Sequence, residues 1–600
     1  MAKKNTYTGS LTGSHVMAMS LMMEGVTDLF GYPGGAIMPF YDVMKDFPDL
    51  NHVLVRNEQG AALAAIGYSR VTGHEKLGVC VATSGPGATN LVTGIFDAYM
   101  DSMPIIAITG QVPTQVAGTD AFQEADVIGI TQPITKQSYY ITDAKDIAAT
   151  VKEAFHIARS GRPGPVLIDF PKDIQNQVVE EFVYPEKTDV KGYRPKVMGN
   201  KRMIQQAAQW LEKAERPLIL AGHGVLIANA MPDLIELAEK MNIPVVTTLH
   251  GLGCFPENHP QSMGMLGMHG FAHCNFAVQE CDVLFGIGLR FDDRIIGKAD
   301  DFAPKASIIH VDIDPAEIGK NVHTELPIVG DARNVLKEMN GIVEQGEYNE
   351  WLKQIEEWKQ EYPVPQSIIQ KKKEEGGGMK LSMRDVVREL YKQTEGQAVI
   401  ASDVGQHQMI TAQEYLFQNP HSHLTSGGSG TMGYALPAAM GAKVAYPEKE
   451  VWAIIGDGSF QMNMQELVTL AQDGIAVKIA VLNNSFLGMV RQWQELFFDK
   501  NYASTPMFNP DFVKLAEACG IKAMKAETNG DMKSVIERMR QETGPVLCEF
   551  VVQKEENVFP MVPSGKSLSD TITCSDGTHK ISGSFYKKFF LTLNFSLCLS

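Results

Sequence analysis

Two short polar segments near the end of the chain contain the residue types of a magnesium and phosphate site. Gly456-Asp457-Gly458 follows the apolar run 451–455, and Asn483-Asn484 comes about 25 residues later, after the apolar run 477–482. Both runs predict buried strands, with a helix over 462–472 between them. In such a unit the strand ends meet at one edge of a sheet. Carboxylate, amide and carbonyl oxygens are hard ligands, which suit Mg²⁺ beside phosphate oxygens.

This spacing resembles the diphosphate-anchoring motif of thiamine-diphosphate (ThDP) enzymes, in which Gly-Asp-Gly precedes a pair of asparagines. The resemblance implies that Asp457, Asn484 and the backbone carbonyl of Phe486 hold Mg²⁺. Gly458 and Ser459 are then expected beside the diphosphate, because glycine lets the backbone approach closely. An isolated Gly-Asp-Gly is usually only a turn. The strand, the helix, the second strand and the paired asparagines together favour the cofactor site.

A carboxyl group is also needed at the other end of such a cofactor. ThDP enzymes remove the C2 proton with the cofactor's own 4′-amino group, which requires an acid at N1′ of the aminopyrimidine ring. Glu58 is the candidate, because it follows the apolar strand 53–55 and opens a helix of small residues that would partly desolvate it. The alternative is an ordinary glutamate at a helix N-terminus, favoured by the helix dipole.

A glycine-rich turn over residues 427–433 precedes another helix. Its bare backbone groups, at Gly430 in particular, could hydrogen-bond the pyrimidine edge. Met432 carries a bulky, adaptable thioether that could lie beneath the cofactor and hold it bent. Gly405, Gln406 and His407 add polar groups suited to the diphosphate, although a structural histidine is the commoner interpretation of His407 by itself.

Strands alternate with helices in three regions, which predicts an α/β protein with three doubly wound parallel-sheet domains of the ThDP-binding type. We expect these domains over residues 10–175, 190–345 and 381–570. Residues 346–380 turn polar and include a Lys-Lys-Lys-Glu-Glu-Gly-Gly-Gly run, which predicts a linker. Residues 571–600 form an atypical tail, whose apolar end is shorter than the ~20 residues of a transmembrane helix.

Composition excludes several classes of function. The chain has 600 residues, is 44% hydrophobic and has a net charge of −17, which is typical of a globular enzyme and makes nucleic acid an unexpected partner. Its eight cysteines form no CxxC pair and no zinc-ligand spacing, which favours a reducing compartment. The first residues have no apolar segment behind them, so we expect a cytoplasmic protein without a membrane anchor.

Nearly the whole chain, about residues 10–570, resembles the catalytic (large) subunit of acetohydroxyacid synthase, also called acetolactate synthase. The matching stretches are residues 31–35, 57–61, 83–90, 121–124, 288–294, 311–315 and 483–493. The resemblance implies a pyrimidine-binding domain, a central FAD-binding domain and a diphosphate-binding domain. It also implies a homodimer or homotetramer with active sites between subunits, and a separate regulatory small subunit.

The implied reaction is a carboligation. Pyruvate is decarboxylated on ThDP, and the hydroxyethyl carbanion condenses with pyruvate or 2-ketobutyrate. The products are 2-acetolactate and 2-aceto-2-hydroxybutyrate, the first common step of branched-chain amino-acid biosynthesis. The acceptor needs a cation for its carboxylate, and Arg294 fits as a planar fork. The alternative is that Arg294 only pairs with Asp292 or Asp293. Trp493 fits the apolar wall for the alkyl group, with Phe122, Met268 and Met489.

The resemblance assigns the remaining site residues. Gln123, counted with the catalytic residues, and Lys172 line the access channel, while Gly34 and Met489 contact ThDP. FAD, structural rather than redox-active, is assigned to Gly222, Gly224, Arg290, Asp312, Ile313 and Asp331. From the residues alone, these six are generic strand-end groups. Family members often have His where this chain has Asn57, which cannot titrate, so a proton-relay role at that position is in doubt.

Several other functions share these features. A pyruvate-oxidase-like enzyme would use its flavin for electrons, and a simple 2-keto acid decarboxylase would release aldehyde and lack the wall formed by Arg294 and Trp493. Catabolic acetolactate synthases lack FAD. An inactive protein of the same fold is expected to lack Glu58, Asp457 or Asn484, and all three are present. Acceptor preference, oligomer size and feedback inhibition are not encoded in any of these patterns.

Overall fold

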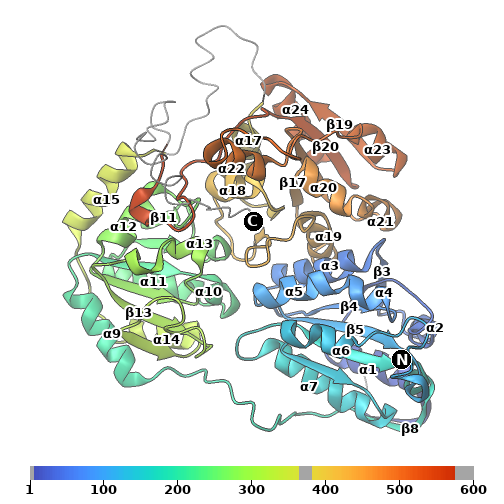
Figure 1. Cartoon of the computed structure of the whole chain (residues 1–600). Helices are drawn as coiled ribbons and strands as arrows, with labels where there is room; N and C mark the ends of the chain where they lie inside the picture. Colours follow the sequence, from blue (N-terminus) through green and yellow to red (C-terminus); the bar gives the residue numbers. More distant parts are fainter. Residues whose placement is uncertain (1–5, 364–380, 574–600) are drawn as a thin grey trace, which may run out of the picture.

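The computed structural model describes residues 6–363 and 381–573. Three lobes follow one another along the chain (Figure 1). Each lobe is built on a six-stranded sheet whose strands all run parallel, with helices on its faces. The predicted α/β class with three doubly wound parallel sheets is confirmed.

The first domain sheet has the strand order β3-β2-β4-β5-β7-β6. Its strands are β2 (Asp28–Gly31), β3 (Asn51–Leu54), β4 (Gly78–Ala82), β5 (Ile105–Gln111), β6 (Gln137–Tyr140) and β7 (Val166–Pro171). Its helices are α1 (Gly13–Met23), α2 (Met38–Val43), α3 (Glu58–Val71), α4 (Pro86–Asn90), α5 (Val92–Met100), α6 (Val127–Thr131), α7 (Ile147–Arg159) and α8 (Lys172–Asn176). The central strands β4, β5 and β7 are buried throughout, as expected for a parallel sheet covered on both faces.

The third domain repeats this arrangement, with the order β16-β15-β17-β18-β20-β19. Its strands are β15 (Val399–Ser402), β16 (His423–Leu424), β17 (Val451–Gly456), β18 (Lys478–Asn483), β19 (Lys522–Ala526) and β20 (Val546–Val551). Its helices are α17 (Met383–Thr394), α18 (Gln406–Glu414), α19 (Ala435–Ala445), α20 (Asp457–Asn463), α21 (Glu466–Asp473), α22 (Gly488–Phe497), α23 (Phe512–Ala518) and α24 (Asn529–Gln541). Numbered within each domain, both sheets read 2-1-3-4-6-5.

The middle domain is wound differently. Its order is β11-β10-β9-β12-β13-β14, which reads 3-2-1-4-5-6 when numbered within the domain. This is the order of dinucleotide-binding sheets, in which the ligand lies where the winding reverses, here between β9 and β12. The strands are β9 (Pro217–Ala221), β10 (Val245–Thr247), β11 (Ser262–Met265), β12 (Val283–Ile287), β13 (Ser307–Asp312) and β14 (Leu326–Val329).

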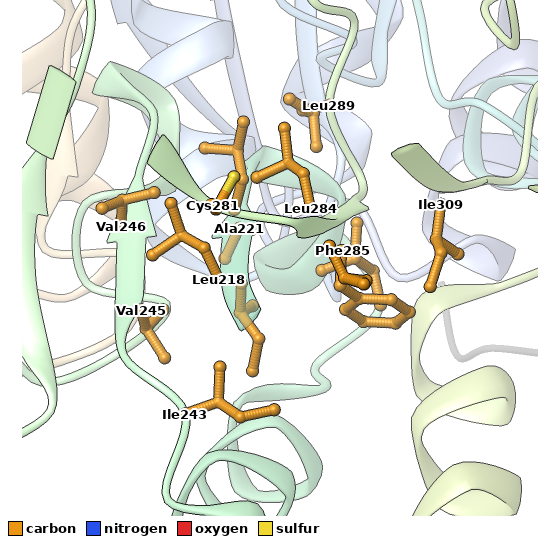
Figure 2. Close-up of a cluster of buried hydrophobic side chains, with 14 of the residues drawn as sticks. Leu218, Ala221, Ile243, Val245, Val246, Cys281, Leu284, Phe285, Leu289 and Ile309 are labelled. Atoms are coloured by element: carbon orange, nitrogen blue, oxygen red, sulfur yellow. The ribbon is translucent and has the colours of Figure 1, made fainter. Parts of the chain in front are cut away.

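Helices α9 (Lys201–Lys213), α10 (His223–Ile227), α11 (Met231–Met241), α12 (Ala272–Glu280), α13 (Asp293–Ile296), α14 (Ala332–Asn340) and α15 (Asn349–Glu361) surround the middle sheet. Figure 2 shows part of the resulting core, where side chains of neighbouring strands such as Leu218, Val246 and Leu284 pack together. Parallel strands covered on both faces read as continuous apolar runs, and β9 and β12 are buried throughout in this way.

Three expectations need correction. The predicted linker 346–380 begins with α15, which buries Trp351 and Ile355 in the middle domain core because its apolar residues fall four apart; residues 364–380 lie outside the described range. The helix expected over 462–472 is two helices, α20 and α21, and α20 starts directly at Asp457. The first sheet region extends beyond the predicted bounds 10–175, because β1 (Thr6–Thr12) and β8 (Val178–Val183) pair antiparallel.

Of the predicted tail 571–600, only residues 571–573 are described, and Ile572 pairs with Met561.

The first and third domains are joined through their helices (Figure 1). Helix α3 packs on α19 along a seam of small residues. A Cβ atom on Gly67 would lie 2.1 Å from the Ala438 carbonyl oxygen, and one on Gly441 would lie 1.9 Å from that of Ala64. Glycine is therefore required at both positions, and the two backbones are in direct contact. This rigid seam fixes where the loops of one domain lie relative to the other.

Within residues 6–363 and 381–573, no helix is both long and apolar enough to cross a membrane.

Candidate active site

The third domain presents a polar cradle at the carboxyl ends of β15, β17 and β18. Gly405 precedes α18, and Asp457 is the first residue of α20. His407 packs between two glycine backbones, since a Cβ on Gly405 or Gly456 would lie 2.8 or 2.7 Å from its Cε1. Its buried Nε2 has no partner among the described residues, and burial lowers the pKa of His407 to about 3. The ring is therefore neutral and one of its nitrogens is available to a ligand.

Asp457 has the environment of a cation ligand. It is 1% exposed, and its carboxylate accepts one side-chain hydrogen bond, from Asn509 Nδ2 at 2.7 Å. Burial raises the pKa of Asp457 to about 6. Its donors, Asn509 and neighbouring backbone N–H groups, are all neutral, and a buried carboxylate is costly unless a cation completes its surroundings. The residues present therefore fit a metal ion at this point.

The paired asparagines Asn483 and Asn484 make different contacts. Asn483 ends β18 and is engaged by the protein, donating to Glu549 Oε1 at 2.7 Å and accepting from Asn509 at 2.9 Å. Asn484 follows at the neighbouring position, and its Oδ1 accepts the backbone N–H of Phe486 at 3.1 Å. Because β17 and β18 pair in parallel, Asp457 and Asn484 leave adjacent strand ends, as predicted. A Cβ on Gly458 would lie 2.8 Å from Leu487 Cδ2, so the leucine side chain would have to shift.

Two predicted diphosphate residues have side chains that are engaged within the protein. The Gln406 amide donates to Gln492 Oε1 at 2.9 Å and to the Glu556 carbonyl at 2.7 Å, so its two N–H groups are already used. The Ser459 hydroxyl donates to the Val404 carbonyl at 3.2 Å. What remains for an anion is the N-terminus of α18, where Gly405 contributes no side-chain cap.

In the first domain, Glu58 lies at the start of α3 as expected. It is 9% exposed and accepts a hydrogen bond from Asn90 Nδ2 at 2.9 Å. Asn57 is the N-cap of this helix, since its Oδ1 accepts the Gln59 N–H at 2.9 Å. An asparagine at this position therefore stabilises the helix that carries Glu58, without any need to titrate. Burial and a single amide donor leave the carboxyl available to a ring nitrogen.

A cavity of about 980 Å³ lies between the middle and third domains, with part of the first domain at its edge. Of the predicted residues, its lining contains Gly224, Met268, Arg290, Arg294, Asp312, Ile313, Asp331, Gly405, Gly430, Met432, Met489 and Trp493. The predicted flavin groups and the predicted acceptor groups thus share one space. Gly222 lies beneath the lining, where a Cβ would lie 2.3 Å from the Gly288 carbonyl oxygen.

The acceptor wall is assembled by the backbone. Met268 N–H donates to the Arg294 carbonyl at 2.8 Å, and Arg294 Nη1 lies 3.3 Å from Met268 Sδ. The Arg294 side chain is 63% exposed, and its ion pair with Asp293 is long, 3.6 Å, and equally exposed. Such a pair contributes little, so the guanidinium remains able to grip a carboxylate. Asp292 pairs with Arg290 instead, at 3.6 Å.

The lining omits Gln406, His407, Asp457, Gly458, Ser459, Asn484 and Phe486 of the third domain, and it omits five further predicted residues: Gly34, Glu58, Phe122, Gln123 and Lys172. All five belong to the first domain. Phe122 is 88% exposed at the tip of a loop whose backbone N–H of Ala121 is held by Glu124 at 2.9 Å. The lining of the cavity, as one chain forms it, therefore lacks the residues predicted to activate the cofactor and to line its entrance.

Comparison with known proteins identifies the same three domains. Models of the thiamine pyrophosphate enzyme N-terminal TPP-binding domain, central domain and C-terminal TPP-binding domain match residues 11–130, 204–339 and 403–550. The chain is 48% identical over 571 residues to the acetolactate synthase large subunit of Corynebacterium glutamicum, covering 93% of this chain and 90% of that protein.

The chain is also 47% identical over 583 residues to the acetolactate synthase of Arthrospira platensis, covering 94% and 98% of the two chains. A probable acetolactate synthase large subunit of Methanocaldococcus jannaschii is 46% identical over 568 residues, covering 94% and 95%. The chain belongs to the acetolactate synthase large-subunit family of thiamine pyrophosphate enzymes. Its ThDP-binding domains are therefore the first and third.

Sequence reasoning missed several residues that build this acetolactate synthase site. Asp403 accepts the N–H groups of Gly433 and Ala435 at 2.9 and 2.8 Å and so holds the end of the glycine turn. Glu466 accepts the N–H groups of Arg56 and Asn57 at 2.9 and 3.2 Å, across the domain boundary. Asn509 bridges Asp457 and Asn483. These contacts join residues far apart in sequence, and no local sequence pattern predicts them.

The turn itself is only partly open. The N–H groups of Gly427 and Gly428 are accepted by Asp101 at 3.0 and 2.7 Å. Gly430 has a φ of +67° and no atom within 4 Å of a built Cβ, so it faces the cavity freely. Of the predicted pyrimidine contacts, Gly430 and Met432 thus remain available, whereas the amides of Gly427 and Gly428 are engaged by the first domain.

Proposed function

We propose that this protein is the catalytic subunit of an acetolactate synthase, which decarboxylates pyruvate and joins the remaining two-carbon unit to a second 2-keto acid. The products are 2-acetolactate from pyruvate and 2-aceto-2-hydroxybutyrate from 2-ketobutyrate. The observation that carries the proposal is that Arg294, Met268 and Trp493 line the same cavity as Gly430 and Met432. A cation and an apolar wall beside the cofactor turn suit a 2-keto acid acceptor.

ThDP, when bound, supplies the electron sink for the carbanion that loss of CO₂ leaves. The residues of the chain have the remaining tasks. Glu58 holds a proton at N1′ of the aminopyrimidine, which makes the neighbouring amino group a base. Arg294 orients the carboxylate of the acceptor, and its planar fork allows two parallel hydrogen bonds. Trp493, Met489 and Met268 exclude water from the carbon that reacts.

Mg²⁺ is proposed between the third domain and the diphosphate. Asp457, Asn484 and the backbone carbonyl of Phe486 would hold it, and its charge would neutralise phosphate oxygens. The lone carboxylate of Asp457, buried beside a neutral donor, supports this assignment. Gly405, His407, Gly458 and Ser459 would surround the diphosphate. Gln406 supports the site by bracing Gln492 rather than by donating to the ligand.

FAD is proposed in the part of the cavity formed by the middle domain, in a structural role. Gly222 and Gly224 follow β9, at the point where the winding of the sheet reverses. Arg290, Asp312, Ile313 and Asp331 complete the wall. Asp312 is enclosed enough that burial raises its pKa to about 7, so it suits a hydroxyl or ring nitrogen as a partner. Here a dinucleotide would fill the space between the middle and third domains.

We further propose a homodimer, or a tetramer made of such dimers, in which the first domain of one subunit faces the third domain of another. In this arrangement Glu58 of one subunit would reach the cofactor that Asp457 of another subunit anchors. The relatives named as large subunits support a separate small subunit. Six described cysteines are free, which supports a reducing compartment such as the cytoplasm.

One assay separates the candidate reactions. Purified protein is incubated with pyruvate, ThDP and Mg²⁺, and acetolactate and acetaldehyde are measured while the flavin spectrum is recorded. Acetolactate as the main product with an unbleached flavin is expected. Acetaldehyde alone would indicate a decarboxylase, and bleaching of the flavin at the rate of turnover would indicate a pyruvate oxidase. A colourless active protein would contradict the FAD assignment only.

A further inference from the structure

The glycine turn of the third domain is held by a carboxylate of the first. Asp101 follows α5 and is 3% exposed. Its Oδ2 accepts the Gly427 N–H at 3.0 Å and its Oδ1 accepts the Gly428 N–H at 2.7 Å. The two residues are more than 300 positions away from Asp101 in the sequence. One carboxylate thus fixes two consecutive peptide units across a domain boundary.

Side chains approach the backbone closely at both Gly427 and Gly428. A Cβ on Gly428 would lie 2.9 Å from Asp101 Oδ1, and one on Gly427 would lie 2.3 Å from His250 Nε2. At Gly430, by contrast, a Cβ would meet nothing within 4 Å. Gly428 therefore serves close approach to the first domain, Gly427 serves close approach to His250 of the middle domain, and Gly430 is left unobstructed.

A second aspartate, Asp97, stabilises the turn through Ser426. Asp97 Oδ2 accepts the Ser426 hydroxyl at 2.6 Å, and Ser426 Oγ in turn accepts the Thr431 N–H at 2.9 Å. Residues 426 to 431 are thus closed into a loop whose two ends meet at Ser426. Asp97 and Asp101 both belong to the C-terminal end of α5, so this helix end holds residues 426–431, whereas Asp403 holds Gly433.

Asp101 is itself held by Arg70 and His250. Arg70 is 2% exposed and donates from Nη1 to the Thr425 carbonyl at 3.1 Å, next to the turn. Its Nη2 lies 2.7 Å from His250 Nδ1, and because arginine only donates, Nδ1 is the acceptor. The proton of this neutral imidazole is then on Nε2, which lies 3.0 Å from Asp101 Oδ1. First, middle and third domains meet in these contacts.

The location is unfavourable for two carboxylates unless the turn is present. Negative charge at the C-terminal end of a helix opposes the helix dipole, and both side chains are buried. Burial alone raises the pKa of Asp101, but His250 and Arg70 outweigh it and lower the pKa below its usual value. Burial and the neighbouring Asp101 raise the pKa of Asp97. Asp101 is therefore the charged member, and the amides of the turn stabilise its charge.

We propose that Asp101, assisted by Asp97, is a positioning residue that holds residues 427–430 in the shape that receives the aminopyrimidine ring of ThDP. The inference rests on the proposed role of that turn at the pyrimidine. The first domain then acts on the cofactor in two ways. Glu58 acts directly, in a site shared with another subunit, and Asp101 acts within its own chain through the turn.

The test is Asp101→Asn in the full-length protein. An asparagine keeps the shape but can accept only through one oxygen, so one of the two glycine N–H groups loses its partner. Calorimetry with ThDP in the presence of Mg²⁺ should show a dissociation constant raised roughly tenfold, the change expected when a charge-assisted hydrogen bond is lost. The turnover number should recover at saturating ThDP, and KM for pyruvate should not change.

Asp169→Asn is the matched control. Asp169 is an equally buried aspartate of the same domain, but it accepts from Thr109 and Gln111 and does not touch the turn. Its variant should bind ThDP like the wild type. The proposal is overturned if Asp101→Asn binds ThDP as tightly as the wild type, or if Asp169→Asn weakens binding equally, since burial of any aspartate would then explain the effect.

Two further variants keep the outcome interpretable. Ser426→Ala removes the contact between Asp97 and the turn without touching a charge, and it should weaken ThDP binding several-fold even if Asp101→Asn does not fold. Unchanged affinity would contradict the proposal. Met432→Ala tests the turn itself. If Met432→Ala weakens binding and Asp101→Asn does not, only the positioning role is wrong; if neither does, the role of the turn is wrong as well.

Discussion

The first and third domains have the same sheet and different strand ends. Both sheets read 2-1-3-4-6-5, and helices α3 and α19 pack backbone against backbone between them. At the carboxyl ends of its strands, the third domain carries a buried cradle with Asp457 and His407. The first domain carries one carboxyl group there, Glu58, and an exposed loop with Phe122 at its tip. The scaffold is repeated, whereas the chemistry is divided.

This difference bears on how the protein works. The third domain can anchor a charged ligand by itself, because its groups are buried, pre-arranged and short of partners. The first domain offers an acid for the ligand's other end, Glu58 at the start of α3. Anchoring and activation are therefore assigned to different domains, and in our proposal to different subunits. Each prediction below tests one side of that division.

The largest effect is expected from Glu58→Gln. Glutamine keeps the shape of the side chain but cannot hold the N1′ proton as an acid does, so acetolactate formation should fall by about 10²–10⁴-fold. ThDP affinity, measured by calorimetry, should change little because the third domain is intact. Glu24→Gln is the control, as Glu24 is a buried glutamate of the same domain that pairs with Lys152 and Arg159. Turnover like the wild type in Glu58→Gln would refute the assignment.

Mixing two inactive variants tests whether the division crosses subunits. Glu58→Gln and Asp457→Ala are unfolded and refolded together, or coexpressed, and acetolactate synthesis is measured. If sites are shared, half of the dimers are mixed and each has one intact site, so activity should return to about a quarter of the wild-type value. Each variant treated alone is the control. If the mixture stays inactive although mixed dimers form, both groups act within one chain.

Binding of Mg²⁺ and ThDP to the third domain should depend on pH through Asp457. Burial raises its pKa to about 6, and a metal ligand must be deprotonated, so binding of Mg²⁺ and ThDP should weaken as the pH falls through that value. Between pH 7 and pH 5 the fraction ionised falls about tenfold, and the affinity should follow. Calorimetry at both pH values measures this. In Asp457→Asn the affinity should be low and nearly independent of pH, and a slope like that of the wild type there would point to another group.

Elements of the fold differ in how well the sequence predicts them. The ends of β17 and β18 are predicted because buried parallel strands read as apolar runs that end in glycine or a polar residue. Helix α15 of the middle domain falls within the predicted linker, because its polar composition masks the helical spacing of Trp351 and Ile355. Short partly exposed strands such as β6 give no such signal.

The site shows the same limit. Asp457, Asn484 and Glu58 were found because each follows a strand with a recognisable local pattern. Asp101 and Asp403 were not, since the groups they hold lie about 330 and about 30 residues away. Asn57 was noted only as a departure from a family pattern, and its role as the N-cap of α3 needed coordinates. Local chemistry is predictable from spacing, whereas positioning contacts between domains depend on the tertiary fold.

The smallest effect is expected at the exposed side of the first domain. Phe122 is 88% exposed in one chain, which is costly for so large an apolar side chain unless another surface covers it. If a second subunit does so, Phe122→Ser should raise the dissociation constant of the dimer about tenfold or more, since burying a phenylalanine contributes about 1.5–3 kcal/mol. Sedimentation over a range of concentrations measures this, and unfolding of the dissociated chain should be unchanged.

Met198→Ser is the matched change outside the first domain. Met198 is 61% exposed and lies in the segment that enters the middle domain, where no predicted site residue requires a partner. Its variant should dimerise like the wild type. If the two changes weaken the dimer equally, the interface is not centred on the first domain and the division between anchoring and activation loses its structural support. If only Phe122→Ser does so, and ThDP affinity falls with dimer content, the exposed loop belongs to the shared site.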